Sequence, residues 1–288
     1  MPRPVCITYD STCDLTPQLL ERFQIRTVPL TIQSGERVFA DDGQYTSADL
    51  YADYRRNGTL PKTAAVSPEE FKSFFLPILE EGYDIVHIDI SSELSCTCQN
   101  AVLAAQELAE QGRVYVVDSR QLSTGGGLLA LQGAKLRDSG MDAADVAEEL
   151  RGLASCGDTS FVLDTLEYMW KGGRCSGVAA LGANVLKLKP CLEMREGKLV
   201  VCKKYRGAMG KVYRQYITER LAGKTVVEDH AFITHSGEVS EDTLRELTEL
   251  VRELAPFKEV FITQAGCTVS SHCGPGTLGV LFLRQPAQ

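Results

Sequence analysis

The chain has 288 residues, of which 44% are hydrophobic and 24% are charged, a composition typical of a folded globular protein. The length suits two domains with separate cores. The formal charge is −8 and no long basic run occurs, which argues against nucleic acid as a partner. The opening residues lack the pattern of a secretory signal, and no apolar run could cross a membrane. We therefore expect a cytoplasmic protein without an integral membrane segment.

The first two thirds of the chain repeat a short apolar run, a turn rich in hydroxyl groups or glycine, and a stretch with helical periodicity. This alternation is typical of a parallel α/β sheet. The predicted strands are apolar on both faces, as strands covered on both sides require. They are residues 5–8, 26–32, 85–90 and 114–117.

The clearest predicted helix begins at Ser67, which serves as its N-cap. Pro68 takes the first helical position and Glu70 completes a capping box. Its buried stripe is expected to contain Phe71, Phe74, Phe75, Ile78 and Leu79. A second helix is predicted after residues 91–100 and a third after the Thr-Gly-Gly-Gly run at 124–127.

Residues 138–158 predict a turn, a helix and a glycine stop, which we interpret as the passage into a second domain. Beyond it we predict a strand at 160–163, helical stretches up to residue 186, a hairpin with strands 190–194 and 199–203, a helix at 240–254 and strands at 258–263 and 278–283. The predicted fold class is α/β with two domains. Residues 1–156 would form a three-layer α/β/α domain with a parallel sheet, and residues 157–288 a two-layer α/β domain with a mixed sheet.

Three turns rich in hydroxyl groups or glycine lie where a parallel sheet presents helix N-termini to a ligand. They surround Thr63, span residues 91–97 with Ser95, and span residues 118–127. Together they predict an uncharged, donor-rich anion pocket, although each hydroxyl taken singly is more often only a helix cap. The glycine run matches neither a phosphate loop nor a dinucleotide fingerprint, so it does not indicate nucleotide binding.

Ten cysteines are scattered through the chain, and a reducing compartment would keep them as thiols. Cys96 with Cys98, and Cys267 and Cys273 near His272, make a zinc site conceivable. These spacings differ from the usual paired zinc ligands, so packed thiols are favoured and no metal site is predicted. His272 is expected in a turn fixed by a following Gly-Pro-Gly, where a structural and a functional role are equally open.

Several short motifs succeed one another along essentially the whole chain. They are Asp10-Ser11-Thr12, Thr63 ahead of Ser67-Pro68, Ser91 to Ser95, Asp118-Ser119, Gly172-Gly173-Arg174, Lys189-Pro190, Tyr205-Arg206-Gly207, and His272 with Gly274-Pro275-Gly276. In this order the motifs resemble those of the DegV family of bacterial fatty-acid-binding proteins. The chain departs from the family pattern at Ala64 to Val66, at Cys96 and at Cys98.

The resemblance implies a long-chain fatty acid, such as palmitate, in a tunnel between the two domains. Its carboxylate would be bound by Thr63, Ser95 and His272. The residues expected to support this pocket are Thr97, Ser123, Gly126 and Gly127. Uncharged hydroxyl donors would leave the carboxylate nucleophilic, whereas a buried arginine would hold it in a strong pair.

The resemblance also implies a partner, a separate kinase that uses ATP to convert the bound acid into an acyl phosphate for phospholipid synthesis. Arg174 and Arg206 would contact this kinase or its phosphates. The protein itself would then be a carrier without a cofactor and without catalytic residues.

Two alternatives remain open from the sequence. Ser95 and His272 could act as nucleophile and base of an acyl-transfer or hydrolase enzyme, but no Gly-x-Ser-x-Gly motif surrounds Ser95 and no acid that orients His272 can be named. The protein could also be a lipid sensor or transport protein that has no kinase.

Overall fold

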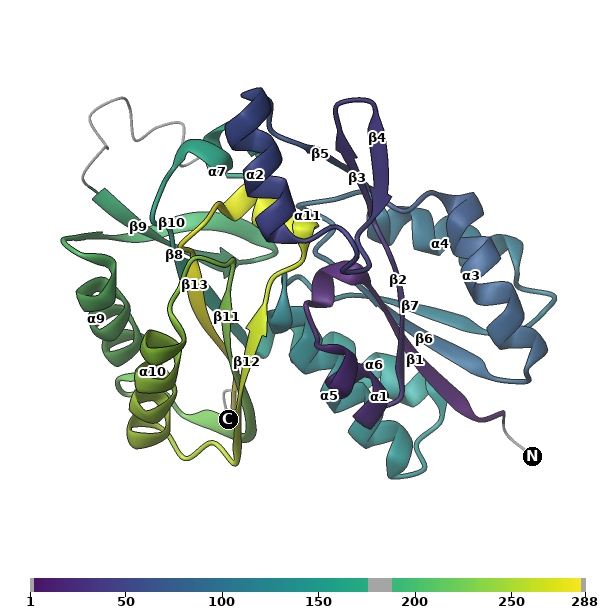
Figure 1. Cartoon of the computed structure of the whole chain (residues 1–288). Helices are drawn as coiled ribbons and strands as arrows, with labels where there is room; N and C mark the ends of the chain where they lie inside the picture. The colour runs from purple at the N-terminus through teal and green to yellow at the C-terminus, as the bar shows by residue number, and fades with distance from the viewer. Residues whose placement is uncertain (1–2, 176–187, 286–288) are drawn as a thin grey trace.

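The computed structural model describes residues 3–175 and 188–285, and its first half is built on a parallel sheet (Figure 1). The strand order among the described residues is β2-β1-β6-β7. These strands are β1 (Val5–Asp10), β2 (Ile25–Val28), β6 (Asp84–Asp89) and β7 (Val114–Asp118). Because β2 and β6 lie on opposite sides of β1, the sheet has a topological switch point at the carboxyl end of β1, where ligands of such sheets commonly bind.

Helices cover both faces of this sheet, which confirms the predicted three-layer arrangement. One face carries α3 (Pro68–Glu80) and α4 (Thr97–Glu107), and the other carries α1 (Pro17–Arg22), α5 (Thr124–Asp138) and α6 (Ala143–Leu153). The predicted capping box at the start of α3 is present, with Ser67 and Glu70 each bonded to the other's backbone N–H. Phe71, Phe75, Ile78 and Leu79 are buried as predicted, whereas Phe74 is only partly buried.

The second half of the chain forms a mixed sheet with the order β10-β9-β8-β13-β11-β12 among the described residues. The strands are β8 (Gly157–Val162), β9 (Leu188–Arg195), β10 (Lys198–Arg206), β11 (Val226–His235), β12 (Glu259–Gln264) and β13 (Leu278–Arg284). Helices α9 (Met209–Leu221) and α10 (Glu241–Leu254) pack on one face. The other face packs against α5, because Phe232 and Leu281 share a core with Leu128 and Leu129. The predicted hairpin is confirmed, with strands longer than expected.

The segment between β2 and α3 forms a small substructure of its own. It forms an antiparallel sheet of β3 (Thr31–Ser34), β4 (Arg37–Ala40) and β5 (Lys62–Ala64), with α2 (Ser47–Asn57) between the last two. The single strand predicted at 26–32 is therefore wrong. The chain leaves the parallel sheet after Val28 because Pro29 has no N–H to donate, and the N–H of Leu30 bonds to Ser11 Oγ.

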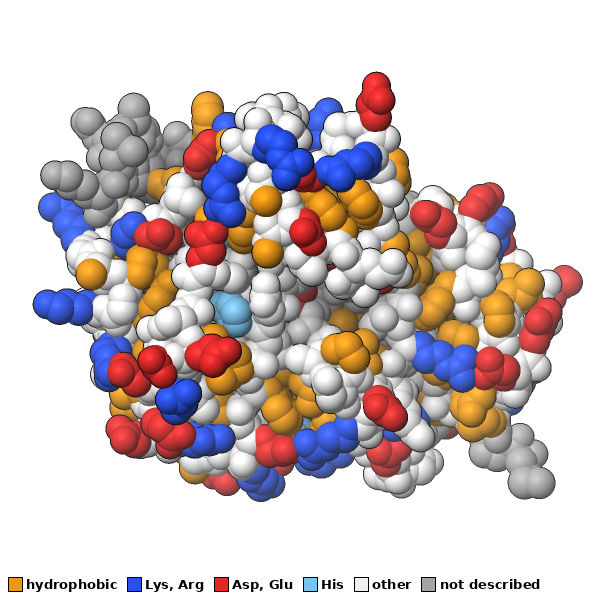
Figure 2. Space-filling model, in the orientation of Figure 1, with side chains coloured by type: hydrophobic (Ala, Val, Ile, Leu, Met, Phe, Trp, Pro, Cys, Tyr) orange, Lys and Arg blue, Asp and Glu red, His pale blue; other side chains and the backbone are white. Residues whose placement is uncertain are grey.

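Helix α2 joins the two halves of the molecule. Its Tyr51 and Tyr54 pack with Tyr168 of α7 (Glu167–Gly172) and Cys267 of α11 (Cys267–Cys273). Figure 1 shows α2 beside α7 and α11, above the line where the two large sheets meet. Short helical turns η1 (Ser11–Cys13) and η2 (Ala154–Cys156) complete the described elements. On the face shown in Figure 2, acidic and basic side chains are intermingled along the lower edge.

Three further predictions need correction or lie outside the described residues. Helix α4 begins at Thr97 rather than after residue 100, and α5 begins at Thr124, so the three glycines form its first turn. His272 lies in the last turn of α11 and not in the turn that follows it. The helical stretches predicted up to residue 186 include α7, while residues 176–187 are outside the described part.

The glycines at the start of α5 allow the helix to approach β1 and β8 closely. A Cβ at Gly125 would overlap the Thr159 hydroxyl, one at Gly126 would overlap the Tyr9 hydroxyl, and one at Gly127 would lie 2.9 Å from the Cys13 carbonyl oxygen. Any larger residue would force α5 away from a fully buried core.

We predict that Gly126→Ala lowers the free energy of unfolding by about 1–3 kcal/mol, because the added methyl group overpacks the core at Tyr9. Urea denaturation measures the change. Gly210→Ala in α9 is the control, since nothing lies within 4 Å of the added Cβ, and it should leave stability unchanged or raise it by up to about 1 kcal/mol. Equal unfolding free energies for the two variants would contradict the packing argument.

Candidate functional site

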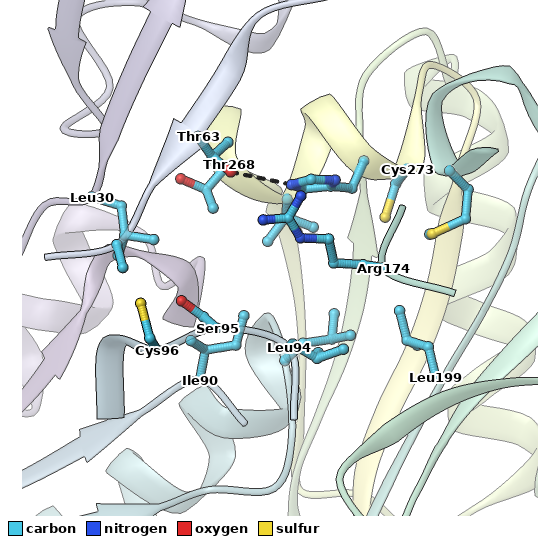
Figure 3. Close-up of a pocket in the computed structure, with 15 residues that line it drawn as sticks. Leu30, Thr63, Ile90, Leu94, Ser95, Cys96, Arg174, Leu199, Thr268 and Cys273 are labelled. Atoms are coloured by element: carbon cyan, nitrogen blue, oxygen red, sulfur yellow. Dashed lines mark hydrogen bonds between the residues drawn. The ribbon is translucent and has the colours of Figure 1, made fainter. Parts of the chain in front are cut away.

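A cavity of about 340 Å³ lies between the two halves of the chain (Figure 3). Its volume is within the range of about 300–1,000 Å³ that small-molecule sites occupy. The first half of the chain contributes Leu30, Thr63, Ala65, Ile90, Leu94, Ser95, Cys96 and Leu122, and the second half contributes Met169, Arg174, Leu199, Thr268, Val269, His272 and Cys273. Most of these side chains are apolar, so the cavity has a largely apolar wall with a few polar groups.

The polar groups of the cavity come from segments far apart in the sequence. Thr63 lies in β5, Ser95 precedes α4, and His272 lies in α11. The hydroxyl of Thr63 is 3.2 Å from Nε2 of His272. Figure 3 shows the hydroxyl of Ser95 and the guanidinium of Arg174 directed toward the same space. The fold therefore brings Thr63, Ser95 and His272, which were predicted to form one site, to the same cavity.

Ser95 also stabilises the start of α4. Its hydroxyl accepts a hydrogen bond from the backbone N–H of Thr97 at 3.2 Å and lies 2.7 Å from the Thr97 hydroxyl. The residue at the formal N-cap position is Cys96, which makes no side-chain cap. Thr97 is buried behind Ser95, so it holds the Ser95 side chain without lining the cavity.

The Gly172-Gly173-Arg174 motif shapes the cavity around His272. A Cβ at Gly172 would overlap Nδ1 of His272, so only glycine allows α7 to end this close to the imidazole. Gly173 has a left-handed backbone with φ of 68° and ends the helix. The chain then turns back, and the Arg174 guanidinium donates to the carbonyl oxygen of Gly172 at 2.8 Å. Arg174 is exposed at the edge of the cavity.

His272 is held in the neutral state. Burial, with a smaller effect from the positive charge of Arg174, lowers the pKa of His272 from 6.5 to about 4. Its Nδ1 is buried without a hydrogen-bond partner among the described residues. At pH 7 the site therefore presents an uncharged imidazole beside uncharged hydroxyl groups.

Helix α11 is positioned by carboxylates from the other half of the chain. Asp41 accepts hydrogen bonds from the backbone N–H groups of Cys267 at 2.8 Å and Thr268 at 3.1 Å, and Asp14 accepts one from Gly266 at 2.8 Å. Gly266, at the N-cap, has no side chain that could cap the helix. These two aspartates supply the missing caps at the helix N-terminus.

The Asp10-Ser11 motif fixes two apolar walls of the cavity. The Asp10 carboxylate, at the end of β1, accepts hydrogen bonds from the backbone N–H groups of Thr12 and Ile90, both at 2.8 Å. The Ser11 hydroxyl accepts from the N–H of Leu30 at 3.1 Å. Ile90 and Leu30 both line the cavity, whereas Asp10 and Ser11 do not, so this motif positions the wall from behind.

The other residues selected from the sequence lie outside the cavity wall. Ser123 donates to Asp14 and lines a smaller cavity of about 20 Å³, which shares Leu122, Val269 and Cys273 with the first. Gly126 and Gly127 pack in the core against Tyr9 and Cys13 and do not line either cavity. Arg206 is exposed at the end of β10 and does not line the cavity.

His87 takes part in a separate buried hydrogen-bond chain. Its Nδ1 is 2.7 Å from the Thr8 hydroxyl and its Nε2 is 3.0 Å from the Asp89 carboxylate. All three side chains are fully buried, beside Phe71 and Phe75. Since no ligand can reach it, this Thr-His-Asp chain is structural.

Within residues 3–175 and 188–285, no group of three or more His, Cys, Asp or Glu is arranged to hold a metal ion. Cys267 and Cys273 are buried free thiols. No helix in these two ranges is both long and apolar enough to cross a membrane.

The model of the DegV family, described as an uncharacterised protein family, matches residues 4–285. The chain belongs to the DegV family. A DegV domain-containing protein of Streptomyces coelicolor is 31% identical over 286 residues, which cover 98% of this chain and 99% of the relative. A fatty acid-binding protein of Thermotoga maritima is 29% identical over 280 residues, covering 96% of each chain.

Solved structures of DegV proteins have the same fold. A DegV family protein from Thermus thermophilus, described for its fatty acid binding, superposes with a TM-score of 0.87 at 31% identity, covering 98% of this chain and 100% of its own. A DegV lipid-binding protein from Thermotoga maritima gives a TM-score of 0.85 at 27% identity, covering 99% and 100%. These relatives are described as binding proteins and not as enzymes.

We predict that His272 titrates near pH 4, far below an ordinary histidine, because burial and Arg174 disfavour its cation. As the pH falls from 6.5 toward 4, the unfolded chain binds a proton that the folded protein does not, so this group makes folding progressively less stable over that window. NMR of the imidazole carbons measures the titration.

Arg174→Gln tests how much the positive charge of Arg174 contributes to the low pKa of His272. This variant should raise that pKa. Arg245→Gln, on the distant helix α10, should leave that pKa unchanged. A His272 midpoint near 6.5 in the unmodified protein would contradict this account.

Proposed function

We propose that this protein binds a long-chain fatty acid, such as palmitate, through its carboxylate at Thr63, Ser95 and His272, and presents it to a separate kinase. One observation carries the proposal: uncharged donors from three distant segments meet at one cavity whose remaining wall is largely apolar. The fatty acid binding described for relatives of the DegV family supports the same ligand class.

The chemistry of the polar groups suits a carboxylate. The hydroxyls of Thr63 and Ser95 can each donate a hydrogen bond to it, and neutral His272 can donate through Nε2. None of these groups is charged, so the bound carboxylate keeps its nucleophilic oxygens. Arg174 is exposed and bonded to the Gly172 carbonyl oxygen, so solvent weakens its pairing with the acid.

The acyl chain would be buried against the apolar wall of the cavity. Leu30, Ile90, Leu94 and Met169 line it, and Leu122 connects it with the smaller cavity near Ser123. Each buried methylene contributes about 0.8 kcal/mol. A long chain therefore supplies most of the affinity, while the hydroxyls select a carboxylate.

We further propose that the kinase acts at the side where Arg174 lies, and that it converts the carboxylate into an acyl phosphate. Arg174 and Arg206 are both exposed, so each guanidinium is free of the core and available to a partner or its phosphates. The carrier itself needs no cofactor in this scheme.

The alternative of a Ser-His enzyme has weaker support. The Ser95 hydroxyl bonds to Thr97, whereas Nε2 of His272 bonds to Thr63. No carboxylate among the described residues orients Nδ1 of His272, as a catalytic base requires. Covalent labelling of Ser95 by a fluorophosphonate probe would favour the enzyme over the carrier.

We predict that Thr63→Ala and Ser95→Ala each weaken fatty acid binding by about 1–3 kcal/mol, because a buried carboxylate loses a donor. Mass spectrometry of the co-purifying lipid identifies the acid, and calorimetry with that acid measures the affinity. Ser73→Ala and Thr218→Ala are matched controls, since their exposed hydroxyls bond only to backbone carbonyls. Unchanged fatty acid affinity in both Thr63→Ala and Ser95→Ala would contradict carboxylate binding by these hydroxyls. Ser95 would then only stabilise the start of α4.

For the kinase step we expect Arg174→Ala to keep fatty acid binding and to lose acyl phosphate formation when incubated with ATP and a cognate kinase. Arg206→Ala should also keep fatty acid binding and lower acyl phosphate formation. The control is Arg245→Ala, which lies on α10. If the unmodified protein binds the acid but gives no acyl phosphate with any cognate kinase, the lipid sensor or transport alternative replaces this proposal.

A further inference from the structure

A second cavity, of about 540 Å³, differs from the first in its chemistry. The residues that line it are Arg120, Gln121, Ala154, Ser155, Gly157, Asp158, Glu193, Met194, Arg195, Glu196, Gly197, Arg220, Lys224 and Arg284. None of them lines the apolar cavity. It lies where the loop after β7 meets β8, the β9–β10 hairpin and the end of α9.

This cavity carries a positive charge in a protein whose overall charge is negative. Five of its lining side chains are cationic and three are acidic, an excess of two positive charges, whereas the whole chain has a formal charge of −8. Such a local reversal of sign attracts anions.

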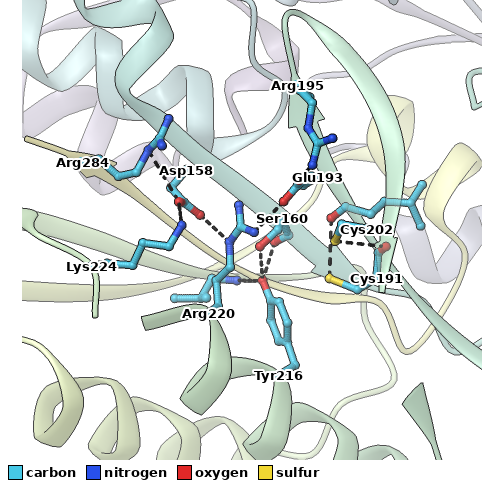
Figure 4. A network of polar contacts seen from close by, with 12 residues as sticks. Asp158, Ser160, Cys191, Glu193, Arg195, Cys202, Tyr216, Arg220, Lys224 and Arg284 are labelled. Atoms are coloured by element: carbon cyan, nitrogen blue, oxygen red, sulfur yellow. Dashed lines mark hydrogen bonds and ion pairs between the residues drawn. The ribbon is translucent and has the colours of Figure 1, made fainter. Parts of the chain in front are cut away.

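The acidic groups inside the cavity are too few to neutralise the cations around them. The buried carboxylate of Asp158 pairs with Arg220, with Lys224 at 2.6 Å and with Arg284 at 3.7 Å (Figure 4). Glu193 pairs with Arg195 and, at 2.6 Å, with Arg220.

Two carboxylates thus serve four cations. The guanidinium of Arg120, on the same wall, makes no hydrogen bond or ion pair with any residue in the described ranges.

Gln121, which also lines this cavity, carries an unsatisfied hydrogen-bond acceptor. Its side chain is only 4% exposed, and its Nε2 donates to the carbonyl oxygen of Ala154 at 2.9 Å. Its Oε1 is buried without a partner among the described residues. A buried acceptor of this kind is costly unless a donor satisfies it.

We propose that this cavity binds a small soluble phosphate monoester that carries a hydroxyl group. The phosphate dianion matches the two excess positive charges, and arginine side chains bind phosphate oxygens through paired N–H groups. The ligand hydroxyl donates to Oε1 of Gln121 once this side chain, whose Oε1 is buried in the present structure, shifts toward the cavity. The volume is within the range of small-molecule sites, and the site shares no lining residue with the apolar cavity.

Isothermal calorimetry of the full-length protein with glycerol 3-phosphate, inorganic phosphate and sulfate tests the proposal. Glycerol 3-phosphate should bind most tightly and sulfate most weakly, because sulfate has the charge but no donor. All three affinities should fall with added salt. Arg120→Gln should weaken glycerol 3-phosphate binding about tenfold, while Arg245→Gln, which removes the same charge on α10, should leave it unchanged.

Gln121→Met tests the hydroxyl contact. This variant should bind glycerol 3-phosphate and sulfate with equal affinity, because the unpaired acceptor is gone, and its melting temperature reports whether it still folds. Arg120→Gln removes an exposed side chain without a partner in the described structure, so it keeps the test valid if Gln121→Met does not fold.

Three outcomes would overturn the inference. The first is no binding of any of the three anions at millimolar concentration, which would leave the network as a structural clamp between β8, β9 and α9. The second is equal binding in Arg120→Gln and Arg245→Gln. The third is sedimentation with phosphatidic acid vesicles without binding of glycerol 3-phosphate, which would make the phosphate a lipid headgroup instead of a soluble ligand.

Discussion

The geometry of the apolar site depends on the capping of α11 by two aspartates from the other half of the chain. The helix is short, its N-cap residue is Gly266, and no side chain of that residue caps it. Asp14 and Asp41 accept its N-terminal N–H groups, and this fixes the far end of the helix, where His272 meets Thr63. Burial raises the pKa of Asp14 to about 8, so keeping this carboxyl group ionised in the junction is unfavourable. The same contacts hold the two halves together, so the cavity is complete only when the two halves are in contact.

Much of the fold follows from local chemistry and was predictable for that reason. The capping box at Ser67, the apolar strands and the hairpin at Gly197 are set by neighbouring residues along the chain. Thr63, Ser95 and His272 could be selected because hydroxyls at strand ends and a histidine beside a glycine-rich turn are distinctive, and because their order resembles the DegV pattern. The resemblance, more than periodicity, linked the three residues to one site.

The remainder depends on contacts between distant segments. Pro29 ends a strand that looks continuous in sequence, and the next residues pair with β5 instead. The glycines of α5 look like a ligand loop but serve close packing. The apolar wall includes Leu30, Met169 and Leu199, which carry no local signal and become neighbours only when the two halves meet. The same holds for Asp14 and Asp41, whose backbone partners are more than two hundred residues away.

Arg120, Gln121 and Leu122 are consecutive, yet the first two face the polar cavity and the third faces the apolar one. The Gln121 carbonyl oxygen accepts from Ser91 at 2.9 Å, so this short stretch is tied to the loop that carries Ser95. An occupant that shifts Gln121 must also shift Leu122 and the space left for an acyl chain. Thermodynamic linkage then requires reciprocity: whatever a filled polar cavity does to lipid affinity, bound lipid does equally to anion affinity.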